Sequence, residues 1–307
     1  MKLTYRLKVN FSVALSIMRG IRNWYVPFLY RFGLRSFNVV TFTNGDRITI
    51  DGRRVTLSNL QWILRLRENL PSSKIGYQED GRIVITLPSG LKFVADEFTL
   101  ETTLKTIDEQ FGLDLYRVKD VSLKGKTVVD IGANIGDSSI LFASKGATVY
   151  AFEPVPRSYR NLLENVTLND FQDKIFAFNV GLGAEEKEIK MGISADSLIG
   201  FSVIQPSSSP PTAFETIRIV EAISFMKEKG ITSCDFLKID CEGCENALLN
   251  DSSLLDFLKP ERAIVEWHFG NRAGVVEKLR AHYSEIVQVP ISESGDNGLV
   301  YAHGLLT

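Results

Sequence analysis

The chain has 307 residues, of which 44% are hydrophobic and 23% are charged, as in ordinary globular proteins with one large domain or two modest ones. No apolar run approaches the roughly 18–20 residues that a membrane span needs, and three cysteines are too few for the disulfide framework of a small secreted domain. We therefore expect a cytoplasmic protein with an apolar core of its own.

Acidic and basic residues are distributed unevenly along the chain. Seven basic residues and no acidic ones precede Asp46, whereas the rest of the chain holds 28 basic and 37 acidic residues. An acidic body disfavours nucleic acid as a partner. Residues 1–36 form a basic, aromatic-rich helical arm that has two open interpretations: helices packed on the body, or a helix in peripheral contact with an anionic membrane surface.

Residues 37–118 are rich in β-branched side chains and turn residues. Residues 38–50 carry Asn44-Gly45 between two β-branched stretches, which predicts a hairpin. A second hairpin is expected from residues 82–87 and 91–95. Two helices are expected, at residues 60–66 and 99–112. The region carries no catalytic grouping, so we interpret it as an accessory region that could cap the next domain or make the protein a homo-oligomer.

Strand and helix patterns alternate from residue 126 onward. Short apolar strands and the helices between them are expected at residues 127–131, 136–144, 148–152, 156–168, 175–180, 236–239 and 263–265. This alternation predicts an α/β domain with an open, mostly parallel sheet and helices on both faces. Such sheets bind ligands beyond the carboxyl ends of their strands, so chemistry is expected where each strand ends.

The first two of these strands end in a pattern typical of nucleoside binding. The first ends in Asp130-Ile-Gly-Ala-Asn-Ile-Gly136, and the second ends at Glu153, 21 residues past Gly132. Glycines allow a tight turn and a close ligand, and an acid at this distance can accept hydrogen bonds from ribose hydroxyls. The spacing differs from the Gly-x-Gly-x-x-Gly of dinucleotide binders. Asp130 would also repel a pyrophosphate, but it suits the amino group of a methionine moiety.

Four motifs together resemble the FkbM-type family of S-adenosylmethionine-dependent methyltransferases. They are Val128-Val-Asp-Ile-Gly-Ala-Asn-Ile-Gly136, Phe152-Glu-Pro154, Asn179-Val-Gly-Leu-Gly183 and Leu237-Lys-Ile-Asp-Cys-Glu-Gly-Cys-Glu245. The resemblance implies a methyltransferase domain over residues 119–307, with a seven-stranded Rossmann-like class I sheet and one antiparallel strand near its end. It also implies S-adenosylmethionine as the cofactor.

By this reasoning the expected cofactor-binding residues are Asp130, Gly132, Asn134, Gly136, Glu153, Pro154 and Asp240. For many family members the resemblance implies O-methylation, so the expected acceptor is a hydroxyl of a sugar, glycan or small metabolite. Two alternatives are a nucleoside-binding module without catalysis and, disfavoured by the glycine spacing, an NAD-dependent oxidoreductase.

The expected catalytic residues follow the fourth and fifth strands. Strand alternation places Lys238 and Asp240 on one face, with Asp240 at the mouth of the cleft and Glu242 just beyond it. His268 follows another strand and is the first candidate for the general base, with Asp240 the second. The alternative for Lys238 is pairing with an acid, and for Glu242 it is capping of a helix.

Two metal hypotheses and one loop stay open. Cys234, Cys241, Cys244 and His268 could bind zinc, although packed thiols are the favoured interpretation. Asp240, Glu242 and Glu266 could offer oxygen ligands to a divalent cation, but the pattern does not decide this and we assign no metal. The Pro/Ser-rich residues 205–212 could form a lid or a plain surface loop.

Overall fold

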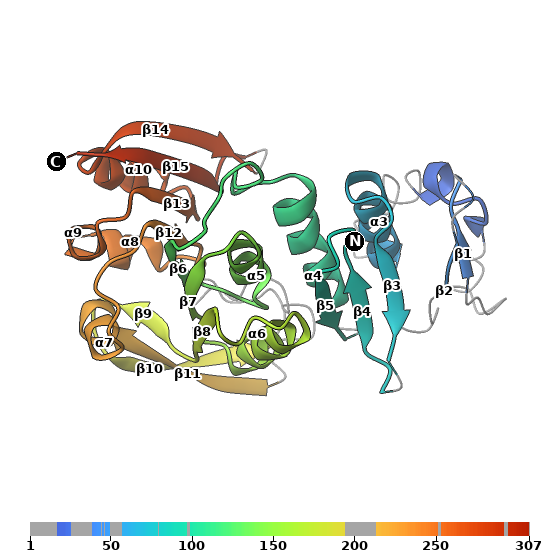
Figure 1. Cartoon of the computed structure of the whole chain (residues 1–307), viewed down its shortest axis with the longest axis horizontal. Coiled ribbons are helices and arrows are strands. Elements are labelled where there is room, and N and C mark those ends of the chain that lie inside the picture. Colours follow the sequence, from blue (N-terminus) through green and yellow to red (C-terminus); the bar gives the residue numbers. More distant parts are fainter. Residues whose placement is uncertain are drawn as a thin grey trace, which may run out of the picture. The chain divides into compact units, whose positions relative to one another are not determined.

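The computed structural model divides the chain into two units, Met1–Leu115 and Tyr116–Thr307, where the sequence suggested boundaries at 36/37 and 118/119 (Figure 1). The structure describes residues 17–25, 39–43, 45, 47–49, 57–78, 80–96, 99–193, 213–250, 253–291 and 294–306. The expected lid at 205–212 and most of the basic arm lie outside these ranges. Within them, no helix combines the length and apolar character that crossing a bilayer requires.

Among the described residues of the first unit are small antiparallel sheets and helical segments. Its elements are β1 (Val39–Thr41), β2 (Arg47–Thr49), α3 (Leu57–Asn69), β3 (Lys74–Tyr77), β4 (Ile83–Thr86), β5 (Lys92–Ala95), α4 (Leu100–Ile107) and the π-helical turn η1 (Asp108–Gly112). β1 pairs with β2, and β4 pairs with both β3 and β5. Both expected hairpins and both expected helices are confirmed, whereas β3 was not expected.

A buried carboxylate joins the helical segments of this unit. Asp108 is fully buried and accepts hydrogen bonds from Arg65 Nε at 3.0 Å and Asn69 Nδ2 at 2.6 Å. Both partners lie on α3, so the pair of bonds fixes α3 against η1. A buried charge needs such partners because it has lost its water.

The second unit is built on one seven-stranded sheet. Its strands run in the order β14-β15-β13-β12-β6-β7-β8, and every pairing is parallel except the two made by β15. Their bounds are β6 (Thr127–Ile131), β7 (Thr148–Phe152), β8 (Ile175–Phe178), β12 (Phe236–Ile239), β13 (Arg262–Trp267), β14 (Tyr283–Pro290) and β15 (Gly298–Leu305). The expected Rossmann-like class I methyltransferase sheet, with one antiparallel strand near its end, is confirmed.

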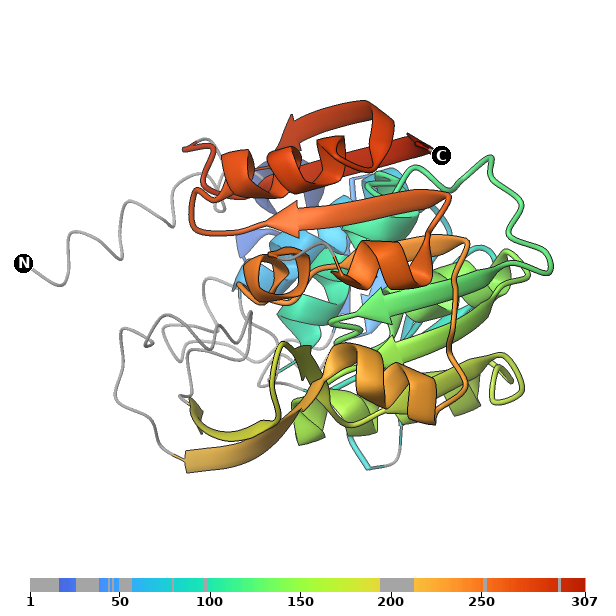
Figure 2. The ribbon, with the colours of Figure 1, turned by 90° about the vertical axis from the view of Figure 1, so that its left-hand side faces the viewer.

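Helices cover both faces of this sheet (Figures 1 and 2). On one face lie α7 (Ala222–Glu228), α8 (Glu245–Leu249), α9 (Ser253–Leu258) and α10 (Arg272–Arg280), and on the other lie α5 (Asp137–Ser144) and α6 (Pro156–Leu168). Ile131, Leu237 and Val265 from the central strands join the first group in one apolar core. Strand alternation sends Asp130 and Lys238 to the α5 face instead.

Two helices begin where local sequence favours a start. Pro156 occupies the first position of α6, where its missing N–H costs nothing. The Glu221 carboxylate caps α7 by accepting from the backbone N–H groups of Ile223 and Ser224.

A second sheet in this unit was not expected from the sequence. It consists of β9 (Gly181–Gly183), β10 (Lys187–Ile193) and β11 (Ala213–Glu221), with β11 in the middle. β10 is an edge strand, and three of its first four residues are charged and exposed, so its sequence gave no apolar strand signal. Ile217 and Ile219 of β11 pack on Val155 and Ile189.

One buried cation connects the two central strands. Lys238 pairs in register with Asp130, and its Nζ lies 3.1 Å from Asp130 Oδ1 and donates to the carbonyl oxygen of Gly132 at 2.6 Å. The side chain of Lys238 is 2% exposed and that of Asp130 is fully buried. Burial lowers the pKa of Lys238, but the carboxylates of Asp130, Asp240 and Asp137 outweigh burial and hold that pKa above its ordinary value.

We expect Lys238→Met to lower the free energy of unfolding by about 3–5 kcal/mol, because the change leaves the Asp130 carboxylate buried without its cation. Urea unfolding at pH 7 measures this. Lys187→Met, at a 52% exposed lysine of β10, is the control and should change stability little. Adding Asp130→Asn to Lys238→Met should restore part of the loss. A Lys238→Met protein as stable as the control would contradict this account.

Candidate active site

Hydrogen bonds to the Asp130 carboxylate hold the turn between β6 and α5 in place. Ser138 and Ser139, in the first turn of α5, both donate to Asp130 Oδ2 at 2.6 Å. Gly136, with φ 86°, is the residue before the helix begins. The contacts of Asp130 are therefore with Lys238 and the helix start, and the expected role of this carboxylate toward an amino group stays a prediction.

Gly132 can be no other residue in this backbone. Its φ is +79°, and a Cβ built on it would lie 1.8 Å from the backbone oxygen of Asp240. The requirement for glycine thus comes from a close approach of the β6 and β12 ends, in addition to any ligand. The same approach brings the turn between β6 and α5 into direct contact with the loop after β12.

Glu153, at the end of β7, reaches back to the same turn. Its Oε2 accepts from the backbone N–H of Asn134 and its Oε1 accepts from that of Val155, both at 2.8 Å. Asn179 donates to the carbonyl oxygens of Glu153 and Pro154 at 2.9 and 3.1 Å. These bonds lock the ends of β7 and β8 beside the turn.

The seven expected cofactor-binding residues therefore divide into two groups. Gly132, Asn134, Pro154 and Asp240 are partly exposed along the edge of the sheet, whereas Asp130, Gly136 and Glu153 are buried behind them. The exposed group can touch a ligand directly. The buried group shapes the backbone that the exposed group presents.

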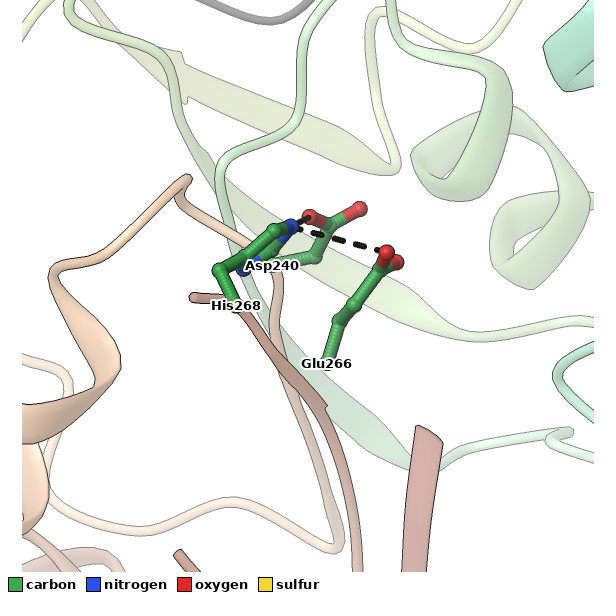
Figure 3. Close-up of side chains that lie close together, drawn as sticks. All are labelled: Asp240, Glu266 and His268. Atoms are coloured by element: carbon green, nitrogen blue, oxygen red, sulfur yellow. Dashed lines mark ion pairs between the residues drawn. The ribbon is translucent and has the colours of Figure 1, made fainter. Parts of the chain in front are cut away.

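Two of the expected catalytic residues, Asp240 and His268, lie together at the ends of β12 and β13, with Glu266 beside them (Figure 3). His268 follows β13 directly, and its side chain is 3% exposed. His268 Nε2 lies 3.8 Å from Asp240 Oδ1, 3.7 Å from Glu242 Oε2 and 3.5 Å from Glu266 Oε1. Lys238 Nζ lies 3.8 Å from Asp240 Oδ2, so all four expected catalytic residues come together.

Glu245 organises this cluster, although the sequence did not single it out as a site residue. Its Oε1 lies 2.7 Å from His268 Nδ1 and also accepts from the backbone N–H groups of Cys241 and Gly243 at 3.3 and 3.2 Å. Glu245 thereby closes the loop after β12 and fixes the orientation of the imidazole. Its position in the first turn of α8 was the available signal.

The charge of His268 bears on its expected role as the base. Burial lowers the pKa of His268, but hydrogen bonds to Glu245 and Glu266 and the charge of Asp240 outweigh burial and raise that pKa to about 11. At neutral pH the imidazole already carries both protons, so it has no free nitrogen to accept another. With the surroundings described here, Asp240 is the better placed of the two candidate bases.

Tyr116 is a site residue that the sequence gave no reason to choose. Its hydroxyl lies 3.5 Å from Asp240 Oδ2, and its ring stacks on Phe142 of α5 with 6.0 Å between centroids. Burial raises the pKa of the Tyr116 hydroxyl well above its usual value, and the charge of Asp240 adds to the rise. Tyr116 therefore stays a hydrogen-bond donor toward Asp240.

The cysteines do not form the zinc site considered above. Cys241 and Cys244 form a disulfide across the loop after β12, so their sulfur atoms are bonded to each other and are not thiolate ligands. Cys234 is a buried free thiol that precedes β12, whereas His268 lies at the opposite, carboxyl edge of the sheet. The expectation of packed thiols is right for Cys234 and wrong for Cys241 and Cys244.

Two buried carboxyl groups beside the turn titrate near neutral pH. Burial raises the pKa of Asp137, the first residue of α5, to about 7, and nearby Asp130 and Asp240 add to the rise while Lys238 opposes it. Burial likewise raises the pKa of Glu153 to about 7, against the two backbone hydrogen bonds that favour its charged form. The charge of this edge thus changes around pH 7.

Comparison with known proteins gives several likenesses. Two tRNA (guanine(37)-N(1))-methyltransferases match part of the chain: that of Mus musculus is 26% identical over 114 residues, and that of Aedes aegypti is 37% identical over 78 residues. These matches cover 35% and 25% of this chain but only 22% and 14% of those proteins. The structure of Methyltransferase FkbM from Methylobacillus flagellatus is 16% identical, with a TM-score of 0.39, over 90% of this chain and 65% of that one.

A family model described as the methyltransferase FkbM domain matches residues 130–288, from the first glycine turn through most of β14. The match takes in the turn between β6 and α5, the end of β7 and the cluster around His268. It covers just over half of the 307 residues. The chain therefore belongs to the FkbM methyltransferase family.

Proposed function

We propose that this chain transfers the methyl group of S-adenosylmethionine to a hydroxyl oxygen of a sugar, glycan or small metabolite. The observation that carries the proposal is the contact between Gly132 and the carbonyl oxygen of Asp240. This contact brings the turn between β6 and α5, where the cofactor would bind, next to the carboxylates of Asp240, Glu242 and Glu266. A methyl donor and an acceptor bound at these two places would meet at the same sheet edge.

The residues at the turn fit this cofactor. The backbone at Gly132 and Asn134 is partly exposed, and Gly132 has no side chain that would keep a ligand away. Negative charge around this backbone comes from Asp137, Glu153 and Asp240. A ligand with an ammonium group and a sulfonium suits such a surface. When bound, S-adenosylmethionine supplies a methyl group on a positively charged sulfur that is reactive without further activation.

The chain's own residues would align the acceptor and take its proton. As the acceptor oxygen forms a bond to the methyl carbon, the carbon–sulfur bond breaks and the hydroxyl proton passes to the Asp240 carboxylate. Lys238 and Tyr116 hold that carboxylate from one side, at 3.8 and 3.5 Å from Oδ2. Asp240 is 28% exposed, so an acceptor can reach it from solvent.

Charge favours a hydroxyl acceptor over the RNA base named in the relatives' descriptions. Asp240, Glu242 and Glu266 surround the place where the acceptor would bind, and the chain from Asp46 onward is acidic. Phosphate backbones bind to basic surfaces and are repelled by acidic ones. A neutral polyol meets no such repulsion and can donate hydrogen bonds to the carboxylates.

Titration calorimetry should give saturable binding of S-adenosylmethionine and S-adenosylhomocysteine and no binding of NAD. Asp240→Asn should weaken S-adenosylmethionine binding several-fold, because it removes one of the negative charges around the cofactor. It should lower turnover by about 10²–10⁴-fold, because it removes the proton acceptor. Turnover is measured as S-adenosylhomocysteine released with sugars and oligosaccharides, or with unmodified tRNA, as acceptors.

Glu185→Gln, at a 74% exposed acid of the same unit, is the control and should leave both quantities unchanged. Methyl transfer to tRNA alone would overturn the hydroxyl acceptor. Binding of S-adenosylmethionine with no turnover on any acceptor, equal in the parent and Asp240→Asn proteins, would favour a module that binds the nucleoside without catalysis. Binding of NAD alone would overturn the cofactor.

The affinity for S-adenosylmethionine should rise several-fold between pH 6 and pH 8. Asp137 and Glu153 have pKa values raised to about 7, so they ionise across this range and then attract the sulfonium. S-adenosylhomocysteine lacks that charge and should change less. Asp137→Asn should flatten the difference between the two ligands. Parallel pH profiles for both ligands in the parent protein would contradict this explanation.

A further inference from the structure

Asp240, Glu266 and His268 form a group that the methyl transfer proposed above uses only in part. Each offers one ligand atom, and these three atoms lie within 4.8 Å of one another (Figure 3). Asp240 comes from the loop after β12, whereas Glu266 and His268 come from β13 and its end. Alternation along β13 puts residues 266 and 268 on the same face, so the backbone itself brings the two side chains together.

Two distances within this group are compatible with ligands that share an ion. His268 Nε2 lies 3.5 Å from Glu266 Oε1 and 3.8 Å from Asp240 Oδ1. A direct charge-assisted hydrogen bond would be about 2.7–2.9 Å long. A tetrahedral cation with bonds of about 2.0–2.2 Å holds its ligand atoms about 3.3–3.6 Å apart. The 3.5 Å distance falls within this tetrahedral range and the 3.8 Å distance lies just above it, while all three ligand atoms lie within 4.8 Å of one another.

The imidazole is independently held in the orientation of a metal ligand. Its side chain is 3% exposed, and its Nδ1 lies 2.7 Å from Glu245 Oε1. Histidines that bind metals nearly always donate their other ring N–H to a carboxylate or carbonyl, which fixes the ring and makes the ligand nitrogen more basic. Glu245 itself accepts hydrogen bonds from two backbone N–H groups, so the His268 ring is held in one orientation, with its Nε2 facing Asp240 and Glu266.

The group also has the charge and the access that a cation needs. Glu242 adds a further carboxylate, with its Oε2 at 3.7 Å from Nε2. The imidazolium of His268 offsets part of this negative charge, and a divalent cation in place of its Nε2 proton would offset more. Asp240 is 28% and Glu266 is 20% exposed, which leaves a path from solvent and a side open to another ligand.

We propose that Asp240, Glu266 and His268 bind one divalent first-row cation, such as Mn²⁺ or Zn²⁺. A nitrogen ligand among two carboxylates suits these ions better than Ca²⁺, which prefers six to eight oxygen ligands. The ion would take the place of the proton on His268 Nε2, which is released as the ion binds. Binding of the ion is independent of the proposed function. Its use there rests on that function: a hydroxyl oxygen on the open side of the ion would lose its proton more readily.

Mn²⁺ titration followed by electron paramagnetic resonance tests the site, because the signal of free Mn²⁺ falls as the ion binds. We expect one Mn²⁺ per chain, displaced by Zn²⁺ and little affected by an equal concentration of Ca²⁺. Glu266→Gln and Asp240→Asn should each weaken binding at least about tenfold. Both side chains are partly exposed, so both variants should fold, which far-UV circular dichroism checks.

Glu285→Gln is the matched control, because Glu285 is a 67% exposed carboxylate that lies 3.3 Å from another histidine, His303. Its Mn²⁺ affinity should equal that of the parent. The proposal is overturned by the absence of Mn²⁺ binding, or by equal affinities in the Glu266→Gln, Asp240→Asn and Glu285→Gln proteins. S-adenosylmethionine is titrated separately in EDTA, so loss of the cofactor site and loss of the ion site are read from different experiments.

Discussion

A buried ammonium group at the centre of the sheet is the constraint around which the site is arranged. Lys238 lies where β6 and β12 run side by side. Its ammonium group forms an ion pair with Asp130 and donates a hydrogen bond to the carbonyl oxygen of Gly132. Asp130 in turn holds the start of α5 through Ser138 and Ser139. One cation thus sets the strand register, the turn between β6 and α5 and the start of α5, because none of these polar groups can bind water instead.

The same logic extends outward from Lys238 to the surface. Asp240 lies between the buried lysine and the imidazole of His268, and Glu242, Glu245 and Glu266 follow around the ring. Positive and negative groups alternate from the core to the mouth of the site, so each charge is matched by neighbours on both sides. The positive charges of Lys238 and His268 therefore stabilise the carboxylates at the edge of the sheet, because opposite charges attract strongly in a low-dielectric interior.

Much of the main sheet could be predicted because its strands are short, apolar and bounded by helix starts. The expected bounds of β6, β7, β12 and α6 coincide with the observed ones, and these are the segments whose patterns are least ambiguous. β10 and β14 were not anticipated, since they are edge strands, which expose one side and carry mixed residues there. β15 was not anticipated either, although it lies inside the sheet and its first five residues are buried. The family resemblance supplied the antiparallel strand that the pattern of residues could not.

The site was predictable to the extent that its residues lie at strand ends. Parallel strands bring such ends together, so Asp130, Glu153, Asp240 and His268 could be named in advance. The residues that contact them, such as Tyr116 and Glu245, could not be predicted. Tyr116 reaches Asp240 across 124 positions of the chain, and Glu245 acts through a loop whose shape no local pattern defines. Nor could residue types tell that Asp130 and Glu153 turn their oxygens toward the backbone and neighbouring side chains.

The covalent link between Cys241 and Cys244 gives the site a dependence on its chemical surroundings. The link encloses Glu242 and Gly243, both with positive φ, within a small ring next to Asp240. Both cysteines are partly exposed, so thiol–disulfide exchange can reach them. Opening the ring would return backbone freedom to these two residues. Protein kept in a reducing buffer and protein kept in air are therefore two chemical species at this loop, and activities recorded for one do not describe the other.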